Sequence, residues 1–243
     1  MKSIKQILRI SEQGVNRPVR CVADDGNFYW CKGLQSGYMV IVNEWIAGSI
    51  AKRLNLPIPE IEPLFCSAEL SEEWVNAGKM DNDIRERLSS SSMNVVFASK
   101  EVPHALDLRN LTGFEDLSTC TLFTAIYLFD KLVRNTDRTD DNSNILLNDY
   151  VNKTIFIIDH SNAFSPDFSD KEFCKTHIFR NSYAACPQAL HDEIVRGFRK
   201  ELTREFVESI WKEMPDVWQE GTGYRNLTLD SLQDTIFSRL EVI

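Results

Sequence analysis

The chain has 243 residues, 43% of them hydrophobic and 26% charged, which is typical of a globular protein with a sizeable buried core. Its formal net charge is −9 and its longest basic run is two residues, so we expect no binding of nucleic acid. No apolar run is long enough to cross a membrane, and the N-terminal segment lacks the continuous apolar stretch of a signal peptide.

The cysteines and histidines give no sign of a disulfide framework or a zinc site. The six cysteines include no C-x-x-C pair, and the four histidines lack the spacing of zinc ligands. Because no signal peptide is evident, we expect reduced thiols, and we predict a cytoplasmic protein.

The N-terminal part begins with a predicted hairpin and helix. Residues 18–31 predict two strands, because apolar residues alternate in PVRCVA and FYWCK is rich in strand formers. The turn residues Asp25 and Gly26 between them are a strong hairpin signal. Apolar residues at helical spacing then predict a helix over 40–54 that ends near Asn55.

Two further strands are predicted before the middle of the chain. They are EIEPLFC at 60–66 and NVVFASKEV at 94–102. The polar segment 67–92 between them predicts a surface helix or helical hairpin followed by a serine-rich loop. Pro103 follows the second strand and is a reasonable domain boundary.

The second half of the chain is mainly helical. A strongly apolar helix is predicted over 117–135, and the polar loop 137–144 follows it. Two short strands come next, at 145–149 and 154–160, and apolar residues at helical spacing predict a helix over 191–214.

The order of these elements indicates an α+β fold. A β-rich part with one helix precedes a helical part that carries one hairpin. We therefore predict two lobes: a small β-rich N-lobe over 1–103 with antiparallel strands and one key helix, and a larger, mainly helical C-lobe over 104–243.

One loop and the hairpin after it carry the residue types of phosphoryl transfer. Kinase catalytic loops need an aspartate for the proton of the attacking hydroxyl and an asparagine five residues later for a magnesium ion. Asp137 and Asn142 have this spacing. Asp159 ends the apolar strand IFII, where a carboxylate is costly unless it is solvated, paired or bound to a cation, so it is a candidate second metal ligand.

The same loop has two other interpretations. Asn144 directly precedes the strand ILL and is a second candidate for the metal-binding asparagine, but the spacing from Asp137 favours Asn142. A calcium-binding EF-hand loop that starts at Asp137 is ruled out, because it would put Asn142 in place of the glycine and Asn148 in place of the bidentate glutamate.

The N-terminal part supplies candidates for binding the phosphates of ATP. Lys32 ends the predicted strand FYWCK, and Glu44 lies on the next helix, in the order that a kinase needs for a phosphate-binding lysine and its orienting glutamate. The sequence has no G-x-G-x-x-G motif. The segment 11–18, which contains Arg17, is either a phosphate-covering loop or a plain connection between strands.

Five segments resemble the HipA-like kinases, relatives of the phosphoinositide kinases within the kinase-like fold. They are YWCKG (29–33), NEWIAGSIAKRLNLPIPE (43–60), FASK (97–100), NTDRTDDNSNILL (135–147) and IDHSNAF (158–164).

The resemblance implies a bilobal kinase-like fold that uses ATP and Mg²⁺. It implies Asp137 as catalytic base, Asn142 and Asp159 as magnesium ligands, and Lys32 as the ATP-phosphate lysine. The chain departs from the family where Thr139 replaces the histidine of a D-R-H motif.

We expect a serine/threonine-type protein kinase of the HipA-like group, because its essential polar residues are complete. A lipid or small-molecule kinase, an AMP transferase and a nucleotide-binding module without catalysis are the alternatives. The negative net charge disfavours an anionic lipid surface. The acceptor is an unknown protein or small molecule, and the resemblance raises an antitoxin-like partner.

Overall fold

The computed structural model describes residues 1–11, 16–33, 38–70, 72, 94–108, 117–149, 151–152, 154–222 and 227–243. The chain divides into two compact units. The first unit comprises Met1–Trp45, Pro59–Glu101 and Met214–Asn226. The second unit comprises Ile46–Ile58, Val102–Glu213 and Leu227–Ile243.

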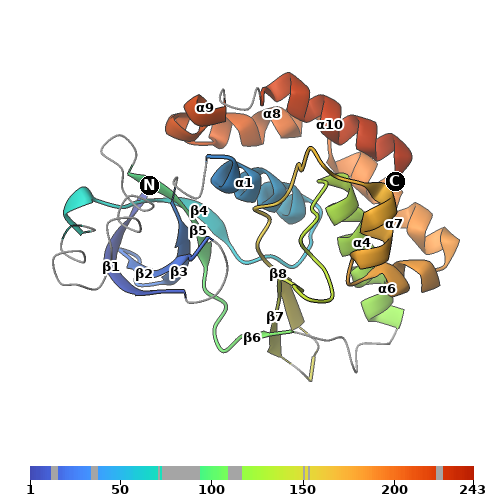
Figure 1. Cartoon of the computed structure of the whole chain (residues 1–243), viewed down its shortest axis with the longest axis horizontal. Coiled ribbons are helices and arrows are strands. Elements are labelled where there is room, and N and C mark those ends of the chain that lie inside the picture. The colour runs from blue at the N-terminus through green and yellow to red at the C-terminus, as the bar shows by residue number, and fades with distance from the viewer. Residues whose placement is uncertain are drawn as a thin grey trace. The chain divides into compact units, whose positions relative to one another are not determined.

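Strands and helices are labelled as in Figure 1. The strands are β1 (Lys2–Ile10), β2 (Val19–Ala23), β3 (Phe28–Lys32), β4 (Ile61–Phe65), β5 (Val95–Lys100), β6 (Leu106–Asp107), β7 (Ile145–Asp149) and β8 (Thr154–Ile157). The helices are α1 (Tyr38–Arg53), α4 (Leu117–Leu132), α5 (Asp170–Thr176), α6 (Arg180–Ala185), α7 (Gln188–Glu201), α8 (Arg204–Glu213), α9 (Asp216–Thr222) and α10 (Leu229–Val242). The predicted mixture of helices and strands is therefore confirmed, whereas the bilobal arrangement stays a prediction.

The five strands of the first unit close into a small barrel in the order β1-β2-β3-β5-β4 (Figure 1). Four of the five pairings are antiparallel, and the parallel pairing of β1 with β4 closes the barrel. The predicted hairpin joins β2 to β3. Gly26 in its turn has a φ of 77°, which glycine adopts without the steric cost of a side chain.

Buried hydrophobic side chains from the five strands and from Cys66 form the core of the barrel. They are Ile4, Ile7, Val19, Cys21, Ala23, Tyr29, Cys31, Leu64, Cys66, Val96 and Ala98. Burial raises the pKa of the Cys66 thiol to about 12, so this thiol is protonated at neutral pH. The described cysteines are all free thiols, and three of them are core residues of the barrel.

A helix from near the end of the sequence packs in the first unit. Trp218 of α9 is fully buried, and its indole Nε1–H donates to the carbonyl of Val95 in β5 (3.0 Å). Its ring meets Trp45 of α1 edge to face, with the centroids 6.1 Å apart.

The second unit contains a three-stranded sheet of order β6-β7-β8 and most of the helices. The hairpin β7–β8 pairs Ile145 with Ile157, so the start of one strand lies beside the end of the other. α4 lies within the strongly apolar helix predicted over 117–135, and its residues Phe123, Ile126 and Phe129 are buried. In the described part of the chain, no helix is both long and apolar enough to cross a membrane.

The structure corrects two sequence expectations. β1 was not predicted. Its buried residues Ile4 and Ile7 are three positions apart, whereas a regular strand places inward-facing residues two apart, and the pairing of β1 with β2 has two register shifts in this region. The helix predicted over 191–214 is divided into α7 and α8, because the hydroxyl of Thr203 accepts from the amide of Phe206 and starts a new helix. Most of the predicted segment 67–92 lies outside the described residues.

Candidate active site

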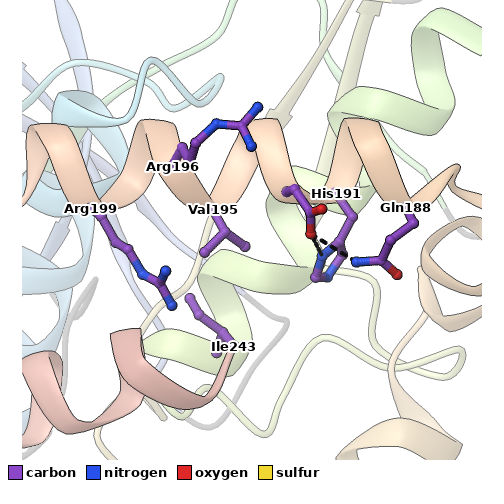
Figure 2. Close-up of a pocket in the computed structure, with 7 residues that line it drawn as sticks. Gln188, His191, Val195, Arg196, Arg199 and Ile243 are labelled. Carbon is purple, nitrogen blue, oxygen red and sulfur yellow. Dashed lines mark hydrogen bonds and ion pairs between the residues drawn. The ribbon is translucent and has the colours of Figure 1, made fainter.

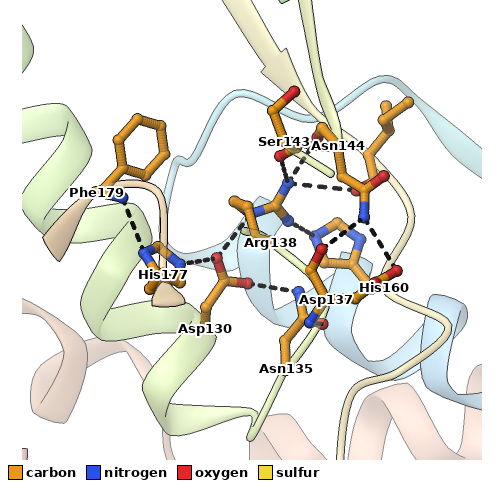
Figure 3. A network of polar contacts seen from close by, with 10 residues as sticks. Asp130, Asn135, Asp137, Arg138, Ser143, Asn144, His160, His177 and Phe179 are labelled. Atoms are coloured by element: carbon orange, nitrogen blue, oxygen red, sulfur yellow. Dashed lines mark hydrogen bonds and ion pairs between the residues drawn. The ribbon is translucent and has the colours of Figure 1, made fainter. Parts of the chain in front are cut away.

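The loop that carries Asp137 begins at a helix end held by buried polar groups. The Asn135 side chain donates from Nδ2 to Oδ1 of Asp130 on α4 (2.9 Å), and both residues are fully buried. The Oδ1 atom of Asn135 accepts from the backbone amide of Asp137 (3.3 Å). The backbone at Asp137 is therefore tied to the end of α4 (Figure 3).

A tight turn follows Asp137 and takes up part of the loop. The backbone amide of Thr139 donates to the carbonyl of Asn142 (2.9 Å), and the hydroxyl of Thr139 accepts from the amide of Asn142 (3.3 Å). Because these two bonds draw residues 139 and 142 together, the loop covers less distance than its number of residues suggests. Thr139, the residue that departs from the D-R-H motif, thus closes this turn.

The structure brings Asn144 next to Asp137. The Asn144 side chain donates from Nδ2 to Oδ2 of Asp137 (3.3 Å) and lies 3.4 Å from the Asp137 carbonyl (Figure 3). Asn142 is exposed, and its backbone groups bond to Thr139. Of the two asparagines that the sequence offers as metal ligands, the described structure therefore joins Asn144 to Asp137, although Asn142 has the expected spacing.

The hairpin β7–β8 carries Asp159 to the same end as Asn144. The amide of Ile158 donates to the carbonyl of Asn144 (3.0 Å), and Asp159 is the next residue. Asn144 and Asp159 both have left-handed backbones, with φ of 50° and 56°. This conformation costs of order 1 kcal/mol for a residue other than glycine, and such residues cluster at functional sites. The hydroxyl of Ser161 donates to Oδ1 of Asp159 (2.6 Å).

A buried network of charged groups lies behind the loop (Figure 3). Asp130 on α4 accepts from Nε of Arg138 (2.7 Å) and contacts Nε2 of His177 (3.0 Å), and all three residues are at most 2% exposed. Burial alone would raise the pKa of the Asp130 carboxyl, but the Arg138 guanidinium and His177 outweigh it and hold this pKa below its ordinary value. Asp130 is therefore an anion that neutralises Arg138.

His177 in this network is a neutral ring. Its Nδ1 accepts from the backbone amide of Phe179 (3.1 Å), so the proton lies on Nε2 and points to Asp130. Burial lowers the pKa of His177, as do the charges of Arg138 and Arg180, whereas Asp130 raises it, and the net shift is downward.

In the first unit, Lys32 and Glu44 form a buried ion pair. Lys32 ends β3 and is 8% exposed, and Glu44 on α1 is 3% exposed. The Lys32 ammonium donates to Oε1 of Glu44. A lysine is seldom buried without a charged partner, and Glu44 provides that partner for Lys32.

Arg17, the other predicted phosphate-binding residue, is exposed and has a φ of 39°. In the segment 11–18, which is predicted as either a phosphate-covering loop or a connection between strands, residues 12–15 lie outside the described residues.

The donor set at the end of the hairpin fits magnesium bound together with a nucleotide. Among the described residues, no three His, Cys, Asp or Glu side chains group to hold a metal. Mg²⁺ does not need such a group, because it is commonly bound by one or two protein oxygens together with phosphate oxygens and water. The amide oxygen of Asn144 and the carboxylate of Asp159 are hard oxygen donors of this kind.

A separate hollow of about 340 Å³ lies on α7 (Figure 2). Its lining includes His191, Arg196 and Arg199, together with Gln188, Asp192, Val195 and Ile243. None of the residues discussed above lines it, so this hollow is distinct from the candidate site.

Comparison with known proteins identifies the class. The chain matches the model of the HipA-like kinases over residues 4–243, and it therefore belongs to this family, as the sequence predicts. Its fold is similar to that of CtkA, a proinflammatory kinase of Helicobacter pylori. The two share 14% sequence identity with a TM-score of 0.55 over 100% of both chains, so the likeness is one of fold. No curated protein matches the chain.

Sequence reasoning missed Asp130, Arg138 and His177 as parts of the site. Asp130 did leave a signal, because it is a carboxylate directly after the apolar stretch AIYLF of α4. A buried carboxylate in such a stretch requires a charged or hydrogen-bonding partner. The identity of that partner is not visible in the sequence, since His177 is 47 residues further along the chain.

Proposed function

We propose that this chain is a protein kinase that transfers the γ-phosphoryl group of Mg-ATP to a serine or threonine hydroxyl. The observation that carries the proposal is the contact of Asp137 with Asn144 at the end of the hairpin that also bears Asp159. A proton acceptor and two oxygen donors for a metal are the parts that a kinase catalytic loop needs.

Asp137 would act as the base. The acceptor's hydroxyl oxygen attacks the γ-phosphorus, the bond from this phosphorus to the β,γ-bridging oxygen breaks, and ADP leaves. The hydroxyl proton passes to the Asp137 carboxylate. The amide of Asn144 donates to Oδ2 of Asp137, which supports a fixed orientation of this carboxylate.

We assign the magnesium ligands to Asn144 and Asp159, in place of the sequence choice of Asn142. When bound, the ion neutralises charge on the phosphates. The contact between Asn144 and Asp137 and the left-handed backbones at Asn144 and Asp159 favour this assignment.

Lys32 would bind ATP phosphates, and Glu44 would keep its ammonium in place. The pair is buried, so the lysine does not adopt the many rotamers of a surface lysine, and less entropy is lost when it meets a phosphate.

The test is transfer of radiolabel from ATP labelled at the γ- or the α-phosphate, with Mg²⁺ and a cell extract as acceptor. We expect γ-label in protein, and a fall of about 100-fold or more in this rate for Asp137→Asn, because general-base catalysis contributes about 10²–10⁴-fold. Asp141→Asn, an exposed carboxylate in the same loop, is the matched control and should retain the wild-type rate.

Label from the α-phosphate would instead identify an AMP transferase. No label from either position, with intact binding of Mg-ATP, would identify a nucleotide-binding module. An Asp137→Asn variant as active as wild type would remove Asp137 from the role of base.

A further inference from the structure

Arg138, directly after Asp137, is a fully buried arginine whose donors face the backbone of the candidate site. Its Nη1 donates to the carbonyl of Asn144 (2.6 Å) and lies 3.2 Å from the Ser143 carbonyl and 3.4 Å from the Ile158 carbonyl. Ile158 precedes Asp159. One guanidinium nitrogen therefore contacts a peptide group at each of the two candidate metal-binding residues.

The other end of the guanidinium reaches the residue after Asp159. Arg138 Nη2 lies 3.4 Å from Nε2 of His160, which is 3% exposed. Arginine carries donors alone, so Nε2 of His160 is the acceptor in this contact. Arg138 thus contacts residues on both sides of Asp159 and the carbonyl of Asn144.

Asp130 holds the guanidinium in this orientation. It binds Nε of Arg138 and is itself fixed by Asn135 and His177, through contacts of 2.9 and 3.0 Å. The planar guanidinium presents five N–H donors in fixed directions, so fixing Nε at Asp130 also directs Nη1 and Nη2. The single ammonium of a lysine could not bond at the same time to the Asp130 carboxylate and to the carbonyls of Asn144 and Ile158.

We propose that Arg138 is a positioning residue, which holds Asn144 and Asp159 in one relative position through their backbones and so sets the affinity for the metal. This inference rests on the proposed function, because it concerns the same metal-binding residues. Without Arg138, the left-handed backbones of Asn144 and Asp159 lose a contact that restrains them.

The test compares Arg138→Lys with wild type. Mn²⁺ is titrated into each protein in the presence of a non-hydrolysable ATP analogue, and electron paramagnetic resonance measures the bound fraction of Mn²⁺. We expect the metal dissociation constant to rise by about tenfold or more, as is typical when a residue that orients a metal ligand is changed. In kinase assays, the Mg²⁺ concentration for half-maximal activity should rise by the same factor. Asp137→Asn should lower kcat without this shift.

Arg239→Lys is the matched control for the loss of a buried arginine. Arg239 is 8% exposed, pairs with Asp170 and donates to the carbonyl of Lys131, which resembles the setting of Arg138. It contacts none of the candidate metal ligands, so its substitution should leave the metal affinity at the wild-type value. An equal shift in both variants would overturn the proposal, as would a folded Arg138→Lys protein with wild-type metal affinity.

If Arg138→Lys does not fold, the double variant Asp130→Asn with Arg138→Met makes the same test. It removes both buried charges together and keeps a side-chain oxygen as an acceptor for Asn135 and His177, so this protein should fold and still bind metal about tenfold more weakly. The two proposals fail separately. A wild type that transfers no label but shows the Arg138-dependent metal shift would overturn only the kinase proposal, whereas label transfer without the shift would overturn only the positioning role.

Discussion

The two units hold their charged residues in different ways. In the first unit, Lys32 and Glu44 bond side chain to side chain from a regular strand and a regular helix. In the second unit, Arg138 pairs with Asp130 and also bonds to backbone carbonyls, and Asn144 and Asp159 belong to irregular segments with left-handed φ. The spacing of apolar residues along the sequence predicts the strand and the helix that carry Lys32 and Glu44. The positions of Arg138, Asn144 and Asp159 depend on the conformation of a loop, which this spacing does not predict.

The largest expected effect is on stability in the second unit. Asp130→Asn should lower the free energy of unfolding by about 3–5 kcal/mol, because it leaves the buried Arg138 charge without its partner. The measurement is urea denaturation at pH 7. The control Asp170→Asn removes a half-exposed partner of Arg239 and should cost about 1 kcal/mol or less. Equal losses in the two variants would show that the Asp130 network is no more critical than an ion pair whose carboxylate is half exposed.

The second prediction concerns the first unit. Lys32→Met should lower kcat/KM for ATP by about 10- to 100-fold, because a hydrogen bond to a charged group contributes about 1.5–3 kcal/mol. Lys100→Met is the control, since Lys100 ends β5 and pairs at the surface with Glu60, which is 69% exposed. Steady-state kinetics should find this control within about twofold of wild type. A similar loss in both variants would contradict a specific role for Lys32.

The third prediction separates the two asparagines of the loop. Asn144→Ala should raise the Mg²⁺ concentration for half-maximal activity by about tenfold, because it removes a proposed ligand. Asn142→Ala should leave it unchanged, since Asn142 is exposed and its turn uses backbone groups. The reverse result would restore the assignment that sequence spacing favours.

The smallest expected effect is the pH dependence from His177. Its pKa is lowered in the folded chain, so below about pH 6.5 the unfolded chain binds a proton that the folded chain does not. This contribution to stability is therefore complete above pH 6.5 and is lost as the pH falls, by at most about 1.4 kcal/mol per pH unit.

Urea denaturation at pH 7.5, 6.5 and 5.5 measures this loss. The charged groups that face His177 are Asp130, Arg138 and Arg180. Hydrogen bonds and neighbouring charges hold the pKa of Asp130 below its ordinary value and raise the pKa of Arg180, so neither of these two groups titrates in this range. His177→Gln should flatten the dependence. An unchanged slope in that variant would assign the effect to other groups.

Much of the fold follows from local pattern. The turn at Asp25 and Gly26, the helix α1 and the hairpin β7–β8 all have short-range signals, because the residues that form them are close in sequence. β1 gave no such signal, since its register shifts put Ile4 and Ile7 at a spacing unlike that of a strand. The break between α7 and α8 depends on one hydroxyl, that of Thr203, within an otherwise helical pattern.

By itself the sequence determined the family, because Lys32, Glu44, Asp137 and Asp159 are residue types whose order along the chain has few other uses. The catalytic and binding roles of these residues stay predictions. Tertiary structure alone decided which asparagine meets Asp137 and that the barrel closes through β1 and β4. The contact of Asn144 with Asp137 and the pairing of β1 with β4 cannot be predicted from the spacing of residues along the sequence. The turn closed by Thr139 shortens the loop, and strand pairing brings residues 2–3 to residues 64–65.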